Sequence, residues 1–170
     1  MIYFMDGVVW RERGKNEPMA EPMGFGRIGI AFWEGVDRIR GMAVEHTITI
    51  RVRYPEVDAM GFLHHSRYLQ YFEMGRVELL RSLGHSYADL ERRGVLFVVV
   101  RVECRFKSPA RYDEELALTT RVMKQTHVRI DHAYELKRGP TLLAEATTTI
   151  ACVDRDGNLR QIPEELGGEG

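Results

Sequence analysis

Cysteine is scarce in this chain, which carries only Cys104 and Cys152 among its 170 residues. Two thiols so far apart form neither the close pair of a zinc or redox motif nor the dense set of a disulfide scaffold. Long apolar runs are also missing, because the longest early candidate, residues 28–33, is short and contains Gly29. A secretion signal and a membrane-spanning segment are therefore disfavoured. We expect a cytoplasmic protein.

An excess of charge of one sign is absent as well. The 24 Lys and Arg residues balance 25 Asp and Glu residues, which leaves a net charge of -1. No overall field therefore steers the chain onto nucleic acid or anionic lipid. Arg outnumbers Lys by 20 to 4, which favours planar contacts with phosphate or carboxylate groups wherever Arg residues cluster. Any basic site must be local.

The first 42 residues lack a sustained apolar period of either 2 or 3.6 residues, although they hold 7 of the 16 glycines. We expect residues 1–42 to be an irregular N-terminal extension, either an over-long start or an arm. The first clean periodic segment follows Met42. We therefore place the working domain at residues 43–170.

The periodic part of the chain begins with a strand pattern and a long helix pattern. Residues 44–53 alternate apolar and polar side chains, which predicts a half-buried strand. Helical spacing then predicts a helix over residues 66–83, ended by Gly84, with an apolar stripe of Tyr68, Phe72, Gly75, Leu79 and Leu83. Gly in mid-helix costs about 1 kcal/mol relative to Ala, which indicates that another backbone passes close to Gly75. A second helix is predicted over residues 86–93, capped by Ser86 and Asp89.

Period-2 patterns fill the rest of the chain. The first predicts a strand with one face made of Val98, Val100, Val102, Cys104 and Phe106. Further strands are predicted over residues 116–122, 128–136 and 142–152, and the tight turns between these three imply antiparallel neighbours. An antiparallel sheet with one apolar face can bury that face against the apolar stripe of one long amphipathic helix. The fold class is therefore α+β.

The best candidate site is the segment 54–68, which places two acids and two histidines just before the long helix. Unpaired N–H groups and the positive end of the helix dipole gather at a helix start. Backbone N–H groups near His65 and Ser66 can hold a developing oxyanion there, while Asp58 supplies a base or nucleophile. The alternative is that Asp58 only caps a turn and Ser66 only caps the helix. A metal site is disfavoured, because no recurrent ligand spacing matches Glu56, Asp58, His64 and His65.

Two motifs in this order resemble hotdog-fold acyl-CoA thioesterases of the 4-hydroxybenzoyl-CoA thioesterase type. Residues 54–78 are similar to the first block of that family through Asp58, Gly61, His65, Tyr68, Phe72, Glu73 and Arg76. Residues 97–113 are similar to its second block through Lys107, Ser108, Pro109, Ala110, Arg111, Tyr112 and Asp113. The resemblance covers nearly all of residues 44–163.

The resemblance implies a central helix wrapped by a five-stranded antiparallel sheet, in homodimers or homotetramers with active sites at the subunit interface. It implies hydrolysis of an acyl-CoA thioester with no cofactor beyond the CoA of the substrate. It also implies that Asp58 is the catalytic carboxylate and that the amide of His65 polarises the thioester carbonyl. Pro55, Val57 and His64 depart from the usual residues of the Tol-Pal-associated bacterial branch. We therefore expect the substrate pocket to differ more than the reaction.

Further residues complete the expected site. We expect Glu73 to support catalysis, although an i, i+3 ion pair with Arg76 explains it equally well. We expect Gly61 and Tyr68 to contact the substrate, although an aromatic residue at helical spacing also fits a core. CoA phosphates require basic residues on an outward face, for which the candidates are Arg101, Arg105, Lys107 and Arg111. An ordinary solvated strand face explains the same pattern.

Two other functions remain open at this point. A hydratase or dehydratase of the same fold would use a His with an acid, but the Asp, Asn, Pro and His cluster of such enzymes is missing. A non-catalytic acyl-binding or partner-binding module is the other alternative. We expect His46 and His132, which lie on apolar strand faces, to be satisfied core residues. The identity of the acyl group and the choice between CoA and acyl carrier protein are left undetermined.

Overall fold

The structure is a computed structural model that describes residues 2–5, 8–11 and 44–166. The chain divides into two compact units, Met1–Asp37 and Arg38–Gly170. In the first unit, β1 (Ile2–Met5) and β2 (Val8–Arg11) pair as antiparallel strands. Most of the extension expected over residues 1–42, and its boundary, lie outside the described residues and stay predictions.

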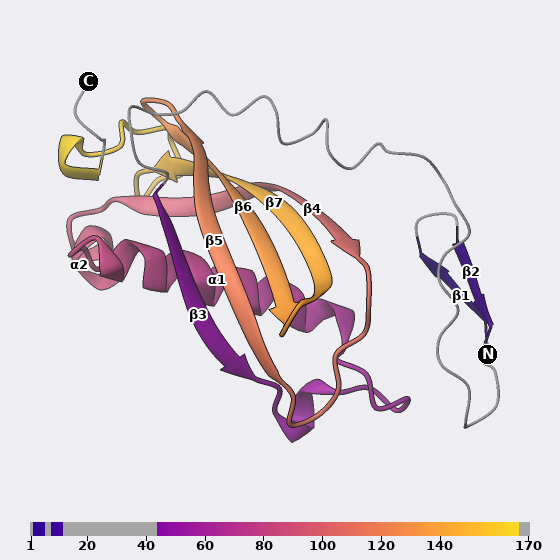
Figure 1. Cartoon of the computed structure of the whole chain (residues 1–170). Helices are drawn as coiled ribbons and strands as arrows, with labels where there is room; N and C mark the ends of the chain where they lie inside the picture. Colours follow the sequence, from indigo (N-terminus) through magenta and orange to yellow (C-terminus); the bar gives the residue numbers. More distant parts are fainter. Residues whose placement is uncertain (1, 6–7, 12–43, 167–170) are drawn as a thin grey trace. The chain divides into compact units, whose positions relative to one another are not determined.

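The second unit contains a five-stranded antiparallel sheet and a long helix (Figure 1). The helix is α1 (His65–Ser82), followed by the short α2 (Tyr87–Arg92). In spatial order the strands are β3 (Glu45–Arg51), β5 (Glu115–Gln125), β6 (Arg129–Arg138), β7 (Thr141–Val153) and β4 (Leu96–Phe106). The 3-10 turns are η1 (Tyr54–Glu56) and η2 (Glu164–Leu166). The α+β class and the five-stranded sheet are confirmed.

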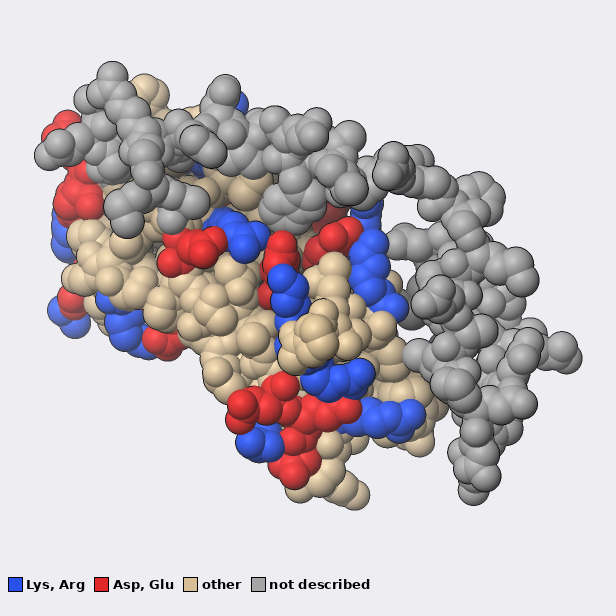
Figure 2. All heavy atoms as spheres, viewed as in Figure 1, with Lys and Arg blue, Asp and Glu red and all other residues tan. Residues whose placement is uncertain are grey.

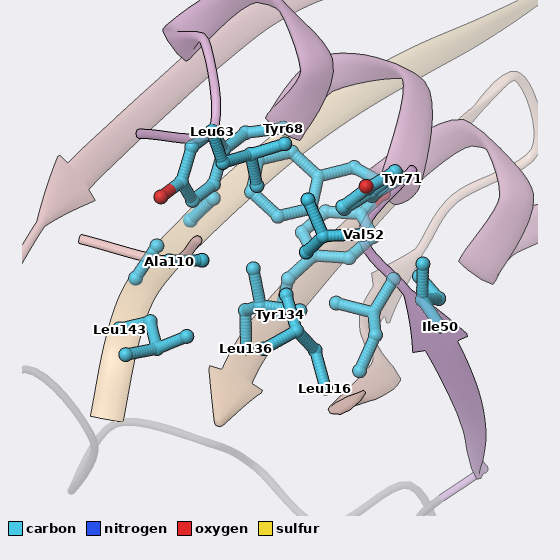
Figure 3. Packing of buried hydrophobic residues seen from close by; sticks show 14 residues of the cluster. Ile50, Val52, Leu63, Tyr68, Tyr71, Ala110, Leu116, Tyr134, Leu136 and Leu143 are labelled. Atoms are coloured by element: carbon cyan, nitrogen blue, oxygen red, sulfur yellow. The ribbon is translucent and has the colours of Figure 1, made fainter. Parts of the chain in front are cut away.

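The main core lies between α1 and the inner face of the sheet, which curves around the helix (Figure 1). The ring of Phe72 stacks on that of Tyr134 with centroids 4.7 Å apart. Figure 3 shows Tyr68 and Tyr71 beside Leu116, Tyr134 and other residues of this core. Full burial of one such large side chain contributes about 1.5–3 kcal/mol, so this packing holds α1 against the sheet.

Gly75 faces β5 at the closest approach between α1 and the sheet. A Cβ atom at this position would lie 2.3 Å from Oγ1 of Thr120 and 2.9 Å from Cδ2 of Leu118. The prediction of a close neighbour is correct, but the neighbour is a pair of side chains rather than a backbone. Side chains that rise from the sheet toward the helix fill the space that Gly75 leaves.

The alternation expected along β4 is wrong in its first half. The pairing of β4 with β7 shifts between Val99 and Arg101, so Val100 is an extra residue in a β-bulge. Val99 lies opposite Ile150 and Val102 opposite Thr148, so these two valines share the inner face. Val98 lies opposite Ala151 on the other face. Periodicity did not reveal the bulge, because residues 98–100 are all valine.

The expected capping pair of α2 is also wrong. Ser86 is the N-cap residue, but its side chain makes no capping hydrogen bond. The carboxylate of Asp89 forms an ion pair with Arg92 instead.

No helix among the described residues is long and apolar enough to cross a membrane.

Candidate active site

The candidate site lies on a tight loop between η1 and α1. Val57 pairs with Leu63 as an isolated antiparallel bridge, and the N–H of Asp58 donates to the carbonyl of Phe62 at 2.8 Å. Gly61 has a φ of 76°, a conformation that Gly adopts at little cost. The N–H of Gly61 donates back to the carbonyl of Asp58 at 2.9 Å. The loop therefore doubles back and leads directly into the start of α1.

Asp58 is held in this loop through one carboxylate oxygen. Its Oδ1 accepts hydrogen bonds from the N–H groups of Met60, at 2.8 Å, and Phe62, at 3.2 Å. The turn-capping alternative is therefore correct as far as Oδ1 is concerned. Oδ2 makes no hydrogen bond to any residue in the described part of the chain. The loop thus fixes the carboxylate and leaves its second oxygen available for chemistry.

The start of α1 is capped by His64, so the alternative in which Ser66 caps the helix is wrong. Nδ1 of His64 accepts from the N–H of Ser66 at 3.3 Å and lies 2.8 Å from its Oγ. The N–H of Arg67 donates to the carbonyl of His64 at 2.9 Å. The N–H of His65 has no acceptor among residues 44–166. Of the two expected oxyanion donors, the N–H of Ser66 already donates to His64, whereas the N–H of His65 is available.

The side chains of His64 and His65 form a tilted pair above the helix start. Their ring centroids are 4.1 Å apart, with an angle of 33° between the planes. His65 is an exposed residue. The described residues contain no cluster of three or more His, Cys, Asp or Glu side chains that could hold a metal ion.

Glu56, which was considered above only as a metal ligand, holds the loop in place. It is only 2% exposed. Its Oε2 accepts from the N–H of Arg53 and from the hydroxyl of Tyr71, both at 2.7 Å, and its Oε1 accepts from the Arg53 guanidinium at 2.6 and 3.0 Å. The carbonyl of Glu56 accepts the N–H of His64 at 2.9 Å. Glu56 thus ties β3, the loop and α1 together.

The environment of Glu56 shifts the pKa values of both buried partners. Burial alone raises the pKa of Glu56, but the hydrogen bonds from Arg53 and Tyr71 outweigh burial, so this pKa lies below its ordinary value. Burial, together with the hydrogen bond to the carboxylate, raises the pKa of Tyr71. Glu56 is therefore ionised and Tyr71 protonated at neutral pH. In the sequence, this cluster is indicated only by the spacing of Arg53 three residues before Glu56.

A comparison with protein families identifies the chain. The model of the thioesterase-like superfamily matches residues 52–168, which include the Asp58 loop, both helices and four strands of the sheet. The chain belongs to the thioesterase-like superfamily. Its fold is the hotdog fold, and the expectation of a thioester hydrolase is confirmed at the level of the family.

This thioesterase is similar in sequence to curated bacterial thioesterases and in structure to a solved thioesterase. The acyl-CoA thioesterase YbgC of Haemophilus influenzae is 35% identical over 120 residues, which are 69% of this chain and 88% of that protein. The acyl-CoA thioester hydrolase YbgC of Escherichia coli O6:H1 is 31% identical over 106 residues, 62% of this chain and 79% of that protein. The structure of a probable thioesterase from Bartonella henselae is 31% identical with a TM-score of 0.67, covering 70% of this chain and 99% of that chain.

Arg111 and Tyr68 were both expected to contact the substrate, but the structure places Arg111 at the surface of the Asp58 loop and Tyr68 in the core. Arg111 pairs with Phe62 as an isolated bridge, and its guanidinium lies 4.5 Å from the centroid of the Phe62 ring. Arg111 therefore lies at the loop, beside Gly61. Tyr68 is buried, with its ring edge-on to Phe106 at 4.8 Å, and burial raises its pKa to about 12. The structure favours the core alternative for Tyr68.

The basic candidates on β4 and the one directly after it form ion pairs with acidic residues. Arg101 forms an ion pair with Glu103, whereas Lys107 and Arg105 share Glu145 at 3.1 and 3.9 Å. Positive and negative side chains are intermixed on the face seen in Figure 2. Among the four basic candidates, Arg111 alone makes no ion pair with a described residue and lies at the Asp58 loop.

Glu73 and Arg76 do not form the ion pair considered as an alternative. Arg76 is 9% exposed and donates from its guanidinium to the hydroxyl of Tyr134 at 3.1 Å, whereas Glu73 is exposed. The Arg76 side chain turns toward the core instead of along the helix surface. Glu73 follows His65 by eight residues, which is about 12 Å along a helix. Within one protomer the structure therefore does not place Glu73 beside the helix start.

Of the two histidines expected in the core, His46 is half-buried and His132 is 5% exposed. The expectation of a satisfied histidine is wrong for His132, because its Nδ1 has no hydrogen-bond partner in the described part of the chain. Burial and the nearby Arg76 charge lower the pKa of His132 to about 3. His132 is therefore neutral near pH 7.

Proposed function

We propose that this chain hydrolyses acyl-CoA thioesters to a free acid and CoA, with Asp58 as base or nucleophile and the N–H of His65 as oxyanion donor. One observation carries this proposal. On one arm of a short loop, Asp58 is held through Oδ1 and keeps Oδ2 available, and on the other arm the N–H of His65 has no acceptor among residues 44–166. The names of the YbgC relatives support the acyl-CoA substrate. No cofactor beyond the CoA of the substrate is needed.

Two courses of the reaction use the same groups. In the first, Oδ2 of Asp58 attacks the carbonyl carbon, the oxyanion collapses to expel the CoA thiolate, and water then cleaves the acyl anhydride. In the second, Asp58 takes a proton from a water molecule whose oxygen attacks the carbonyl carbon. In the first course the thiolate takes its proton from the water that cleaves the anhydride, and in the second the protonated Asp58 passes its proton to the thiolate. In both, the N–H of His65 stabilises the oxyanion. One such donor is typically worth about 10² to 10³ in rate.

The substitution Asp58→Asn tests the proposal against a panel of acyl-CoA esters with thiol detection. Asn keeps the side-chain oxygen that accepts from Met60 and Phe62, so the loop is preserved while the reactive oxygen is lost. We expect kcat to fall about 10³-fold or more. Asp156→Asn, at an exposed turn, is the matched control and should retain wild-type turnover. Retention of a tenth of the activity by Asp58→Asn, or a change in double-bond absorbance without CoA release, would contradict the proposal.

A single turnover in ¹⁸O-labelled water separates the two courses. A nucleophilic Asp58 ends the turnover with label in its own carboxylate when water attacks the anhydride at the Asp58 carbon. General-base action places the label only in the released acid. Mass spectrometry of the peptide that contains Asp58 reads this label, and label in the Asp58 carboxylate excludes pure general-base action.

We further propose that the protein is a homodimer paired through β4. This strand lies at one edge of the sheet, and no described strand pairs with its outer side. Its exposed valines are Val98, Val99, Val100 and Val102, of which Val100 is 59% exposed. An unpaired apolar edge favours association, and a strand pairs antiparallel with its own copy about a twofold axis. Two dimers can associate further into a tetramer.

We also propose a cytoplasmic location. The chain has only two cysteines, without the close pairing of a redox motif or the density of a disulfide scaffold, which suits a reducing compartment. Partition between the cytosolic and envelope fractions of cells that express the full chain tests this location.

A further inference from the structure

Two exposed tyrosines contact each other at the base of the Asp58 loop. Tyr54, in η1, is 75% exposed and Tyr112, in the turn before β5, is 53% exposed. Their ring centroids are 5.5 Å apart, with an angle of 87° between the planes. Among the Phe, Trp and Tyr residues of the range 44–166, these two alone are exposed. Apolar side chains scattered singly over a surface are ordinary, whereas exposed ones that lie together indicate a binding surface.

Backbone hydrogen bonds hold this tyrosine pair, Tyr54 and Tyr112, in place. The N–H of Asp113 donates to the carbonyl of Val52 at 3.0 Å, and the N–H of Val52 donates to the carbonyl of Glu114 at 3.0 Å. These bonds join the turn that carries Tyr112 to the chain just before Tyr54. Because the surface is already fixed, a ligand that binds to it loses little affinity to the ordering of the protein.

The tyrosine pair lies close to the reactive loop of the same protomer. Tyr54 precedes Asp58 by four residues, so their Cα atoms are at most about 15 Å apart. Tyr112 directly follows Arg111, which pairs with Phe62 of the loop as an isolated bridge. In an acyl-CoA ester, the pantetheine arm is a flexible chain of comparable length that joins the thioester sulfur to the nucleotide. The nucleotide can therefore reach the tyrosine pair while the carbonyl lies at Asp58.

Two guanidinium groups beside the tyrosine pair lack a carboxylate partner. Arg111 directly precedes Tyr112, and Arg67 donates to the carbonyl of Pro55, the residue after Tyr54, at 3.5 Å. Neither Arg forms an ion pair with a residue in the described part of the chain. Guanidinium groups bind phosphate through two parallel N–H donors. The surface therefore offers aromatic rings for a base and positive charge for phosphates.

We propose that the tyrosine pair stacks on the adenine base of the CoA part of the substrate, while Arg111 and Arg67 bind its phosphate groups. Adenine is planar and uncharged, and stacking of a base on an aromatic ring typically strengthens binding by a factor of about 5 to 150. The assignment rests on the proposed hydrolysis of acyl-CoA esters. It makes Tyr54 and Tyr112 determinants of the preference for CoA over a carrier protein, whose phosphopantetheine arm carries no adenine.

Three thioesters of one acyl group test the assignment in the wild-type protein. The acyl group is the one that the chain releases fastest from CoA, and the three thiols are CoA, 4′-phosphopantetheine and pantetheine. We expect kcat/KM for the CoA ester to exceed that for the 4′-phosphopantetheine ester about tenfold or more. Equal values would overturn the assignment, because the second ester lacks the adenosine part and retains the rest of the arm.

Removing one aromatic ring tests the stacking. Tyr54→Leu keeps an apolar side chain but has no ring, so we expect kcat/KM for the CoA ester to fall about tenfold. The loss should lie in KM, with kcat unchanged, because the nucleotide is bound equally in the ground state and the transition state. The pantetheine ester should be cleaved as by the wild type. An equal loss for both esters, or no loss for either, would overturn the stacking.

Two further variants serve as controls for Tyr54→Leu. Tyr54→Phe keeps the ring and should preserve the preference for the CoA ester, and its loss there would show that the hydroxyl rather than the ring is needed. Leu159→Ala removes a side chain that is 69% exposed in the turn after β7 and should leave all three esters unaffected. A selective loss of the CoA ester in Leu159→Ala would overturn the assignment to the tyrosine pair.

Removing a guanidinium tests the phosphate contact. In Arg111→Gln we expect kcat/KM for the CoA ester to fall about tenfold, as for a hydrogen bond to a charged group, and to depend less on salt than in the wild type. The pantetheine ester carries no phosphate and should be unaffected. Arg129→Gln, which removes an Arg paired with Asp131 on β6, is the matched control. An unchanged CoA ester in Arg111→Gln would overturn the role of Arg111.

The failure of this assignment and the failure of the proposed function give different results. If the wild-type protein cleaves none of the three esters, the proposed function fails and this assignment fails with it. If the wild type cleaves the CoA and 4′-phosphopantetheine esters equally well, only the assignment of the tyrosine pair fails.

Discussion

Glu56 shows how much of the candidate site depends on a single buried side chain. Its carboxylate contacts Arg53, two residues after β3, and Tyr71 on α1, and its carbonyl accepts the N–H of His64 at the helix start. Asp58 follows two residues later on the same backbone. The geometry of the reactive loop is therefore set by a residue that touches neither the proposed oxyanion nor the attacking oxygen.

The hydroxyl of Tyr71 stabilises this arrangement measurably. A hydrogen bond to a charged group contributes about 1.5–3 kcal/mol, and that of Tyr71 is buried. We expect Tyr71→Phe to lower the free energy of unfolding by about 2 kcal/mol in urea denaturation, with an unchanged slope. Tyr112→Phe is the matched control, because Tyr112 is exposed. Equal stability of the two variants would show that the Tyr71 hydroxyl makes no net contribution.

His132 makes stability depend on pH in a definite direction. Its pKa is lowered to about 3 in the folded protein, whereas an unfolded chain takes up the proton near pH 6.5. Between these values the unfolded state binds more protons, so stability falls as the pH falls, with a slope that approaches about 1.4 kcal/mol per pH unit.

Replacing the imidazole should remove that slope. We expect His132→Gln to be less sensitive than the wild type to acidification from pH 6.5 to pH 4, measured as the free energy of unfolding. His127→Gln, at an exposed position outside the strands, should retain the full dependence. An identical pH profile in His132→Gln and the wild type would contradict a neutral, buried His132.

At the scale of the element, α1 is placed by close packing and by its cap. His64 caps the helix and leaves the N–H of His65 without an acceptor among the described residues. Gly75 allows the helix to approach Thr120 and Leu118 on β5. His64 defines where the helix begins, and Gly75 sets how closely the middle of the helix packs on the sheet.

Gly75→Ala should be destabilising, although Ala favours a helix over Gly by about 1 kcal/mol. The added Cβ would lie 2.3 Å from Oγ1 of Thr120, and overpacking a core costs about 1–3 kcal/mol. We expect a net loss of about 1 kcal/mol in urea denaturation. Thr120→Ala removes the nearest atom, so the double variant should be more stable than Gly75→Ala alone. Purely additive effects would show that Thr120 is not the obstacle.

At the scale of the whole molecule, the two edges of the sheet differ in character. β3 presents an edge whose exposed residues include Thr47 and Thr49, whereas β4 presents exposed valines. Apolar exposure is therefore concentrated on the edge that we propose as the dimer contact.

The edge of β4 should be the part that controls assembly. A charged side chain on an edge strand opposes pairing with another strand, so we expect Val100→Lys to elute as a monomer in light scattering and the wild type as a dimer or tetramer. Thr49→Lys, on the opposite edge, should leave the assembly unchanged. A dimer that persists in Val100→Lys would exclude pairing through this part of β4.

The sequence by itself determined the order of strands and helices, because apolar periodicity reports which face of each segment is buried. It also indicated Asp58 and the amide of His65, because the enrichment of acids and histidines before a helix is a local feature. Only the tertiary structure decided the bulge at Val100, the burial of Glu56 and the acidic partners that neutralise Arg101 and Lys107. Most of these depend on what lies opposite a residue across the sheet or the core, which no local pattern contains.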